Sequence, residues 1–393
     1  MPRRLVLVAL LALLAGCGGG GARRLDTPQL GQRGDQSDAS QQLGFPAFAT
    51  KNTTRVGGAD AVADAAAVAR AVYPGGGAGG TASRPPAVVL IDQRSWQVGL
   101  AAAVLMSAPL RAPLLLSDGD ALPAASSEAL TALAPTGSPA LGGAQIVRAG
   151  AAPAPAGFRT TTLAGSDPIA LTAAIDRLQS AADGRPSRAV VVVSADLPQY
   201  AMPAAAWAAK SGDPILFVHR DTIPGPTFAA LQAHRRPRIY VLGPTAAIGR
   251  GVQRALRGLG TVTRIAGKDP VDSAIAFARF HDGVFGWGVV DPGHGLVFAN
   301  AGRPLDAAAA APLSASGTYG PLLLLDDAAV LPLAVGAYLR DIQPGYTRDP
   351  VRGVYNHGWL IGDEAAISLP VQSRIDSLLE IAPVATTSTS AQP

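Results

Sequence analysis

The residues of this chain that could do chemistry recur in a short Gly-x-Asp pattern that is present three times. The copy at residues 264–269, RIAGKD, precedes a helical stretch and resembles a phosphate-binding loop because a glycine, a lysine and an acid are adjacent. The copies at 55–60, RVGGAD, and 164–167, AGSD, have no lysine. Phosphate binding through Lys268 is therefore not what the three copies share.

The aspartates of the pattern are Asp60, Asp167 and Asp269. Each lies directly before an apolar helical stretch, where a carboxylate can accept hydrogen bonds from the free backbone N–H groups of the first turn. Pro168 and Pro270 follow two of them and suit the first helical position. We expect these aspartates to be helix caps first and binding residues second.

Two copies open with an arginine, Arg55 or Arg264, at the end of a short expected strand. An arginine fork suits a carboxylate or a phosphate equally well. Each arginine could pair with its own aspartate, Asp60 or Asp269, as a structural clamp. Alternatively, each could face an anionic group of a bound polymer.

The sequence contains no set of residues that convincingly indicates an enzyme. There is no G-x-S-x-G or H-E-x-x-H motif, and the single cysteine excludes C-x-x-C. A G-x-G-x-x-G pattern at 75–80 follows a helix and not a strand, which favours a loop over a dinucleotide site. Four residues in one loop-rich stretch could hold a metal, but we expect exposed loop residues there: His281, Asp282, Asp291 and His294. We predict no catalytic activity, no metal and no cofactor.

Composition indicates a globular chain with a large core. Of its 393 residues, 48% are hydrophobic and 15% are charged. Aromatic residues make up only 5%, so the core must consist mainly of Ala, Val and Leu. The net charge of +4 over this length does not indicate a nucleic-acid partner.

The first residues, MPRRLVLVALLALLAGC, predict a secretory signal peptide at 1–16. Two arginines precede an apolar run that is too short to span a bilayer comfortably. The segment ending at Cys17 resembles the bacterial lipobox, which implies a diacylglyceryl group on the Cys17 thiol and a lipid anchor on the extracytoplasmic face of the cell membrane. An ordinary signal peptide with a chance cysteine, or a short anchor, are the alternatives. Residues 17–49, rich in Gly, Gln, Ser and Asp, predict a flexible linker.

The same elements recur in the same order along the chain, at intervals of about 100 residues. Each repeat begins with a strand, the Gly-x-Asp pattern and a helix. An apolar run, an Ala-rich helix and a second apolar run follow, and a helix, a strand and a glycine close the repeat. We place the repeats at 50–159, 160–260 and 261–381, and an unstructured tail at 382–393. The second and third repeats add a final helix, which the first lacks or has much shortened.

The apolar runs, such as VVLI, PILF and LLLL, are continuous and do not alternate with polar residues. Continuous runs between helices are typical of parallel strands covered on both faces. Right-handed crossovers then predict an α/β protein of three small, doubly wound, Rossmann-like parallel sheets.

The repeats resemble the cell wall-binding repeat 2 family. RVGGAD and RIAGKD are similar to the opening motif of that family, and Asp306 with Pro312-Leu313 is similar to a later one. Thr162 replaces the first arginine of the motif in the second repeat. The second arginine of the motif is replaced in all three repeats, by Ala61, Pro168 and Pro270.

This resemblance implies that the three units pack with pseudo-threefold symmetry within a monomer. It also implies that a groove where the units meet holds an anionic secondary cell-wall polymer or a peptidoglycan-associated glycan. Our first hypothesis is a non-catalytic, lipid-anchored envelope protein that binds such a glycopolymer. The alternative is an envelope lipoprotein whose repeats bind a small solute or a partner protein. Clustered arginines in the groove would favour the polymer, and an apolar pocket would favour the small ligand.

Overall fold

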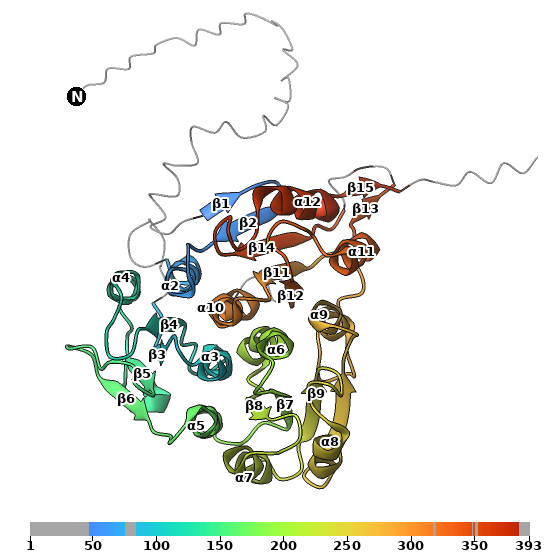
Figure 1. Ribbon diagram of the computed structural model, residues 1–393. Coiled ribbons are helices and arrows are strands. Elements are labelled where there is room, and N and C mark those ends of the chain that lie inside the picture. The colour runs from blue at the N-terminus through green and yellow to red at the C-terminus, as the bar shows by residue number, and fades with distance from the viewer. Residues whose placement is uncertain (1–46, 75–83, 317–319, 348, 350–352, 385–393) are drawn as a thin grey trace, which may run out of the picture.

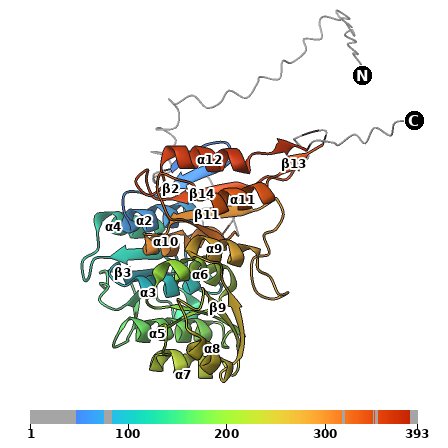
Figure 2. The same ribbon diagram turned by 45° about the vertical axis from the view of Figure 1, so that its right-hand side comes forward.

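A computed structural model of the protein describes residues 47–74, 84–316, 320–347, 349 and 353–384. Three sheets and their helices form a ring that Figure 1 shows end-on, with many helices viewed along their axes. Figure 2 shows the same ring turned by 45°. Cys17 and the predicted signal peptide lie outside the described residues.

The three sheets share one strand order. The first has the order β4-β3-β5-β6, the second β8-β7-β9-β10, and the third β12-β11-β14-β2 with β1 at its edge. All pairs within these sheets are parallel except β1 with β2. This order is that of a doubly wound sheet. The predicted α/β fold with three doubly wound parallel sheets is therefore confirmed.

The strands have the following bounds. The first sheet contains β3 (Val88–Asp92), β4 (Leu114–Ser117), β5 (Ile146–Ala149) and β6 (Thr160–Leu163). The second contains β7 (Ala189–Ser194), β8 (Ile215–Val218), β9 (Arg238–Leu242) and β10 (Thr261–Ile265). The third contains β1 (Ala47–Ala49), β2 (Thr53–Val56), β11 (Gly295–Asn300), β12 (Leu322–Leu325) and β14 (His357–Ile361). The short strands β13 (Gly345–Tyr346) and β15 (Ala382–Pro383) pair with each other.

The described α-helices have 7 to 15 residues, and two short 3₁₀ helices, η1 and η2, lie in the first repeat. They are α2 (Ala61–Val72), α3 (Trp96–Ala102), η1 (Ala103–Met106), α4 (Ala124–Leu133), η2 (Pro139–Leu141), α5 (Pro168–Ala182), α6 (Pro198–Ser211) and α7 (Gly225–Ala233). The remainder are α8 (Arg250–Arg257), α9 (Pro270–Arg279), α10 (Pro304–Ala315), α11 (Leu333–Asp341) and α12 (Leu369–Leu379). The first repeat passes from β5 to β6 without a helix, as the sequence indicated.

The centre of the ring is formed by equivalent helices from the three repeats, α3, α6 and α10 (Figure 1). Small side chains let their backbones approach closely. A Cβ atom on Gly99 of α3 would lie 2.5 Å from Leu305 Cδ2 of α10, so this contact requires glycine or a shift of the leucine. Alanines 307–311 of α10 are buried to within 1% of full burial. Alanine and glycine thus replace the missing aromatic residues by permitting tight helix packing.

Each sheet is completed by the opening strand of another repeat. The opening strand of the second repeat, β6, pairs with β5, and the opening strand of the third, β10, pairs with β9. The opening strand of the first repeat, β2, pairs with β14 near the end of the chain, where Arg55 lies opposite Leu360. The repeats are therefore units of sequence, and strand exchange between the first and third closes the ring.

Two terminal segments are more structured than the sequence indicated. Residues 47–49, at the end of the expected linker, form β1 because they pair with β2. Residues 382 and 383, at the start of the expected tail, form β15. Within the described residues, no helix has both the length and the apolar character needed to span a bilayer.

Candidate functional site

The three aspartates of the Gly-x-Asp pattern are helix N-caps, as predicted. The carboxylates of Asp60, Asp167 and Asp269 accept hydrogen bonds from the backbone N–H groups of Ala63, Ala170 and Asp272, in that order, at 2.8–2.9 Å. The hydrogen bonds that Asp167 accepts from Ala170 N–H and from the Ser166 hydroxyl hold the pKa of Asp167 below its usual range.

The expected Arg–Asp clamp is wrong in its partner, because Arg55 and Arg264 donate to backbone carbonyls and not to Asp60 or Asp269. Arg55 donates from Nη1 to Gly362 O at 2.9 Å and from Nη2 to Ile367 O at 2.6 Å. Its Nε donates to Gln372 Oε1 at 3.1 Å. Burial lowers the pKa of Arg55, whose side chain is enclosed by the loop between β14 and α12.

Arg264 makes the equivalent contacts in the second sheet. Its Nη1 and Nη2 donate to Gly243 O and Ile248 O at 2.6 and 2.8 Å, and its Nε donates to Gln253 Oε1 at 3.1 Å. Burial lowers its pKa as well. Because each arginine lies on an exchanged strand, it ties that strand to another repeat: Arg264 ties β10 to the second repeat, and Arg55 ties β2 to the third.

In the first sheet, the arginine that ties the exchanged strand β6 to the sheet lies on the neighbouring strand β5. Thr162 on β6 occupies the arginine position, and Arg148 lies opposite it on β5. Arg148 donates from Nε to Thr162 Oγ1 at 2.9 Å and from Nη1 to Ala152 O at 2.8 Å. The arginine missing from the motif is thus replaced by one on the neighbouring strand.

Asp306 belongs to a buried charge cluster where the first and third repeats meet. Arg303 Nε lies 2.7 Å from Asp306 Oδ2, and Arg303 Nη2 donates to Asp64 Oδ2 at 2.9 Å. Asp64 Oδ1 accepts the backbone N–H of Gly58 at 2.7 Å. Both carboxylates are completely buried, whereas the arginine side chain is 23% exposed.

Burial raises the pKa of both carboxyl groups, because one guanidinium cannot fully compensate two enclosed negative charges. The pKa of Asp306 rises to about 8, since the nearby Asp64 charge adds to desolvation. The pKa of Asp64 rises to about 6, since its bonds to Gly58 and Arg303 partly offset burial. At neutral pH the two carboxyl groups therefore share a proton.

Sequence reasoning found Asp306 but missed Asp64 and Arg303. The signal for Asp64 was a lone acid in the Ala-rich segment AVADAAAVARAV. In the third repeat, Ser273 takes the same place, and its Oγ accepts the N–H of Gly267 at 3.0 Å. No sequence signal linked Arg303 to Asp64, because 239 residues separate them.

A cavity of about 470 Å³ adjoins this cluster at the carboxyl ends of the strands. Its lining combines the starts of α2, α3 and α10 and includes Asp60, Arg94, Trp96, Arg303 and Asp306. Arg94 is bound to Asp92 at 2.6 Å, and this pair lowers the pKa of Asp92. The cavity therefore offers two arginines that are already paired with carboxylates.

The end of the ring that contains this cavity, the acidic end, carries most of the acids of the connecting loops. Residues that follow the carboxyl ends of strands include Asp60, Asp118, Asp120, Asp167, Asp196, Asp221, Asp269, Asp326, Asp327, Asp363 and Glu364. The basic residues of the same described loops are Arg94, Arg220, Lys268 and Arg303. Carboxylates thus dominate the field at this end.

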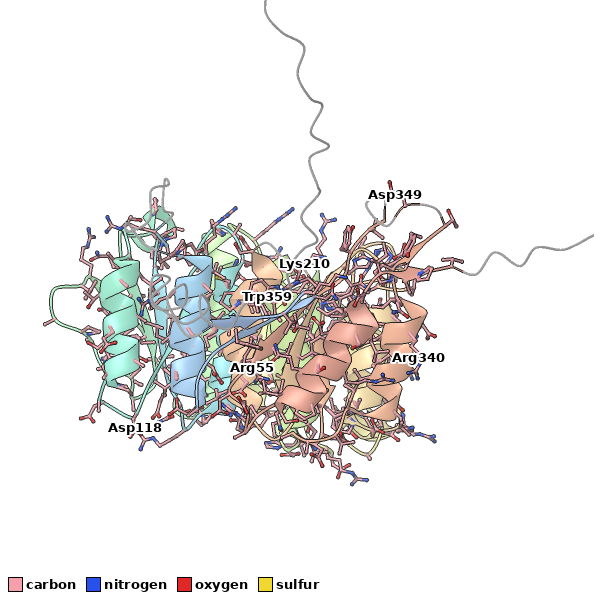
Figure 3. All side chains as sticks on the ribbon, turned by 90° about the horizontal axis from the view of Figure 1, so that it is seen from above. Arg55, Asp118, Lys210, Arg340, Asp349 and Trp359 are labelled. Carbon is pink, nitrogen blue, oxygen red and sulfur yellow. The ribbon has the colours of Figure 1, made fainter. Side chains whose placement is uncertain are left out.

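The opposite end of the ring is rich in exposed basic residues over the first two sheets. We define the basic end by ten residues near the amino ends of these strands: Arg84, Arg111, Arg159, Arg185, Arg188, Lys210, Arg235, Arg236, Arg238 and Arg257. Asp183, Asp213 and Asp282 are the acids near them in the described loops. Figure 3 shows Asp118 of the acidic end and Lys210 of the basic end at opposite ends of the molecule.

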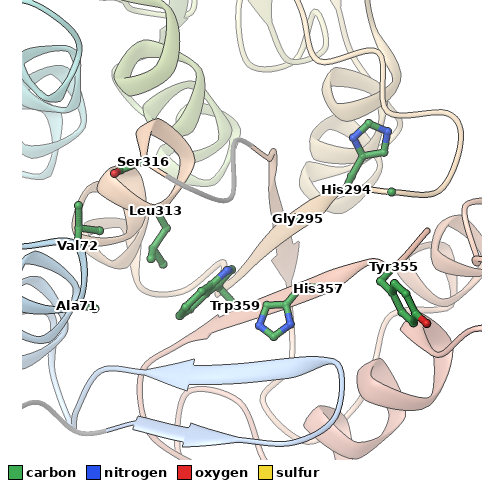
Figure 4. Close-up of a pocket in the computed structure, with 10 residues that line it drawn as sticks. Ala71, Val72, His294, Gly295, Leu313, Ser316, Tyr355, His357 and Trp359 are labelled. Carbon is green, nitrogen blue, oxygen red and sulfur yellow. The ribbon is translucent and has the colours of Figure 1, made fainter. Parts of the chain in front are cut away.

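A second cavity, of about 550 Å³, lies at the amino ends of β11 and β14 in the third sheet (Figure 4). His357 and Trp359 of β14 point into it together with Leu313 of α10. The imidazole and indole rings are in edge contact, with centroids 5.3 Å apart. Burial lowers the pKa of His357, so this ring is neutral at neutral pH.

The loop residues considered as metal ligands do not converge. Asp282 accepts a hydrogen bond from Tyr240 at 2.5 Å, while His294 Nε2 lies 3.0 Å from Asp291 Oδ1. Over the described ranges, no group of three or more His, Cys, Asp or Glu side chains is placed to bind a metal.

The fold and its sites define a triplicated α/β protein with one acidic and one basic end. A family model, Cell wall binding domain 2 (CWB2), matches residues 162–253 and 264–372, together just over half of the chain. The chain belongs to this family, and the matched segments contain only binding domains of this type.

Two solved structures share the fold. Cwp6 from Clostridium difficile superposes with a TM-score of 0.66 at 16% identity, covering 85% of this chain and 49% of that one. Cwp8 from Clostridium difficile superposes with a TM-score of 0.63 at 18% identity, covering 84% of this chain and 52% of that one. The chain thus spans about half the length of these proteins. No curated protein is significantly similar to it.

Proposed function

We propose that this protein is a non-catalytic, lipid-anchored envelope protein that binds an anionic cell-wall glycopolymer. Membership of the Cell wall binding domain 2 family supports a wall ligand, and the lipobox-like segment ending at Cys17 supports the anchor. The observation that carries the choice of an anionic polymer is the basic end, where ten exposed Arg and Lys side chains face three acids.

The basic end suits a polyanion better than the cavity at the acidic end. Phosphate or carboxylate groups of a polymer would approach Arg303 and Arg94 through a field of carboxylates. At the basic end, Arg185, Arg188 and Arg257 are exposed and form no ion pair within the described part of the chain. A cluster of positive charges attracts a polyanion over a distance of about 10 Å in moderate salt.

A matched pair of variants tests this assignment. In one soluble variant, beginning at Gly18, Arg185, Arg188 and Arg257 are each replaced by glutamine. In the control, three basic residues near the carboxyl ends of the strands are replaced by glutamine: Arg220, Lys268 and Arg250, the first residue of α8 after β9. Both variants lose three positive charges, so a general change of net charge affects them equally.

We expect the wild type to sediment with purified walls of its own organism and to be released by high salt. The basic-end variant should lose most of this sedimentation, and the control should retain it. Equal behaviour of the two variants would refute the basic end as the binding surface. Failure of the wild type to sediment would refute wall binding itself.

The alternative function, binding of a small solute, is supported by the cavity at the acidic end. Its wall combines Trp96 and Leu305 with the polar groups of Arg94 and Arg303. A cavity of about 470 Å³ lies in the range of about 300–1,000 Å³ that is usual for small-ligand pockets. A solute of low charge would suit it, and a polyanion would not.

A further inference from the structure

The cavity at the amino ends of β11 and β14 differs from the rest of the surface in its chemistry. Its described lining contains no Arg, Lys, Asp or Glu side chain. Apolar atoms of Val72 and Leu313 form one wall, and the rings of His357 and Trp359 form another (Figure 4). Its volume of about 550 Å³ is usual for a small-ligand pocket.

The rings of this cavity also carry polar groups that are free to bind a ligand. His357 Nε2 lies 3.1 Å from Thr54 Oγ1, and the described residues provide no partner for its Nδ1. Trp359 Nε1–H likewise has no described acceptor, although it is not an enclosed, unsatisfied atom. The hydroxyl of Ser316 lies at the rim. The cavity thus combines apolar ring faces with separate hydrogen-bonding groups.

The described lining of the cavity offers an ion no oppositely charged side chain. Burial lowers the pKa of His357, and the more distant Asp376 only partly opposes this effect. The imidazole is therefore neutral at neutral pH and can accept or donate one hydrogen bond at Nδ1, depending on its tautomer. The imidazole of His294 is held by Asp291 at the edge of the pocket. The described lining therefore favours an uncharged ligand.

We propose that this cavity binds an uncharged sugar ring. A pyranose has an apolar C–H face that can lie on an indole, and hydroxyl groups at its edge that can reach His357 and Ser316. A neutral sugar thus matches the apolar ring faces, the uncharged described lining and the separate hydrogen-bonding groups of the cavity. The identification of this sugar as part of a wall polymer rests on the proposed function.

The location of the cavity would let one polymer reach both the cavity and the basic end. Trp359 lies toward the same end of the molecule as Lys210, as Figure 3 shows. One strand of glycopolymer could therefore place anionic groups on the basic end and a neutral sugar residue in the cavity. The arginines would supply attraction that salt weakens, and the cavity would supply recognition that salt does not weaken.

The test uses the indole N–H signals of the four tryptophans in the folded, soluble protein. They are assigned from single variants that replace each tryptophan by phenylalanine. Glucose, galactose and N-acetylglucosamine are titrated to millimolar concentrations, and uncharged oligosaccharides from the organism's own wall are added separately. Glucuronate serves as the charged counterpart. We expect an uncharged sugar to shift the Trp359 signal, and glucuronate to bind more weakly.

His357→Ala should weaken this sugar binding by roughly tenfold, the loss expected for one or two hydrogen bonds. Trp96→Phe, which changes the other cavity, should leave it unchanged. A shift with the wall oligosaccharides identifies the wall as a source of the sugar, and a shift with only the free sugars identifies a soluble sugar as the ligand. No Trp359 shift with any uncharged sugar, or equal loss in both variants, would overturn the proposal.

These outcomes are separable from those of wall sedimentation. If the wild type fails to sediment but the Trp359 signal shifts, the sugar site stands and the wall-binding function fails. If sedimentation persists and no sugar shifts Trp359, only the sugar site is refuted.

Discussion

Arg303 of the third repeat donates a hydrogen bond of 2.9 Å to Asp64 of the first, across 239 residues of sequence. The same guanidinium lies 2.7 Å from Asp306, so one cation is shared by two buried carboxyl groups. Removing it leaves both groups enclosed without a positive charge. Their location at the junction of the two repeats makes this cluster a part of the ring closure.

We predict that Arg303→Gln lowers the free energy of unfolding by about 3–5 kcal/mol, the usual cost of leaving a buried charge uncompensated. Urea denaturation at neutral pH measures this change. Arg220→Gln is the control, because its ion pair with Asp221 is exposed and should contribute at most about 1 kcal/mol. Similar losses in both variants would contradict the prediction.

The raised pKa values of Asp64 and Asp306 predict that the cluster is most stable in acid. The folded state retains protons that the unfolded state releases near pH 4, so the contribution is complete below about pH 4. It is lost as the pH rises through about 6 for Asp64 and about 8 for Asp306. Asp306→Asn removes the higher titration and should gain stability relative to the wild type between pH 6 and 8. Urea denaturation of both proteins across this pH range measures the difference in their free energies of unfolding. A difference that does not change with pH would refute the prediction.

Arg264→Lys should destabilise the second sheet almost as much as Arg264→Ala. The planar fork donates simultaneously to Gly243 O, Ile248 O and Gln253, and an ammonium group cannot reproduce this geometry. We expect a loss of at least about 2 kcal/mol in the free energy of unfolding, since buried carbonyls lose their donors. Thermal and urea unfolding measure it, and full rescue by lysine would show that charge alone matters.

The exchange of β2 predicts sharply different effects of two N-terminal truncations. A chain that begins at Lys51 retains β2 and should remain a folded monomer. A chain that begins at Gly58 lacks β2 and Arg55, exposes the edge of β14, and should associate or aggregate. Size-exclusion chromatography distinguishes these outcomes. A monomeric, stable product from the shorter chain would show that the ring does not need this strand.

The lipid anchor has a separate test at Cys17. Cys17→Ser should abolish labelling by a radioactive fatty acid and leave the precursor unprocessed, because the hydroxyl cannot replace the thiolate as nucleophile. Membrane fractionation together with labelling measures both effects. Normal labelling of the variant would refute the lipobox interpretation.

The features that the sequence predicted are those set by local chemistry. Asp167 and Asp269 were predictable as caps because the cap, the proline and the apolar helix are adjacent. The strands were predictable because each is a short continuous apolar run; all five residues of β3, for example, are buried. The missing helix of the first repeat was likewise visible as a shorter segment.

The features that the sequence did not predict depend on contacts between distant residues. Arg55 precedes Asp60 by five positions, which suggested a local pair, yet its partners follow β14 some 300 residues later. Nothing in the segment around Thr162 indicates that Arg148 on the neighbouring strand β5 would supply the contacts of the missing arginine. Strand exchange changes which residues are neighbours, and spacing along the chain cannot show this.

The antiparallel strand β1 determines where a tether would pull. Ala47 lies opposite Val56, the last residue of β2, so the chain enters the described fold at the acidic end. With the lipid proposed on Cys17, this attachment point and not charge would favour an outward basic end, because anionic headgroups attract basic residues. The tether would therefore join the ring on the side opposite the proposed binding surface, which leaves the basic end accessible to the wall.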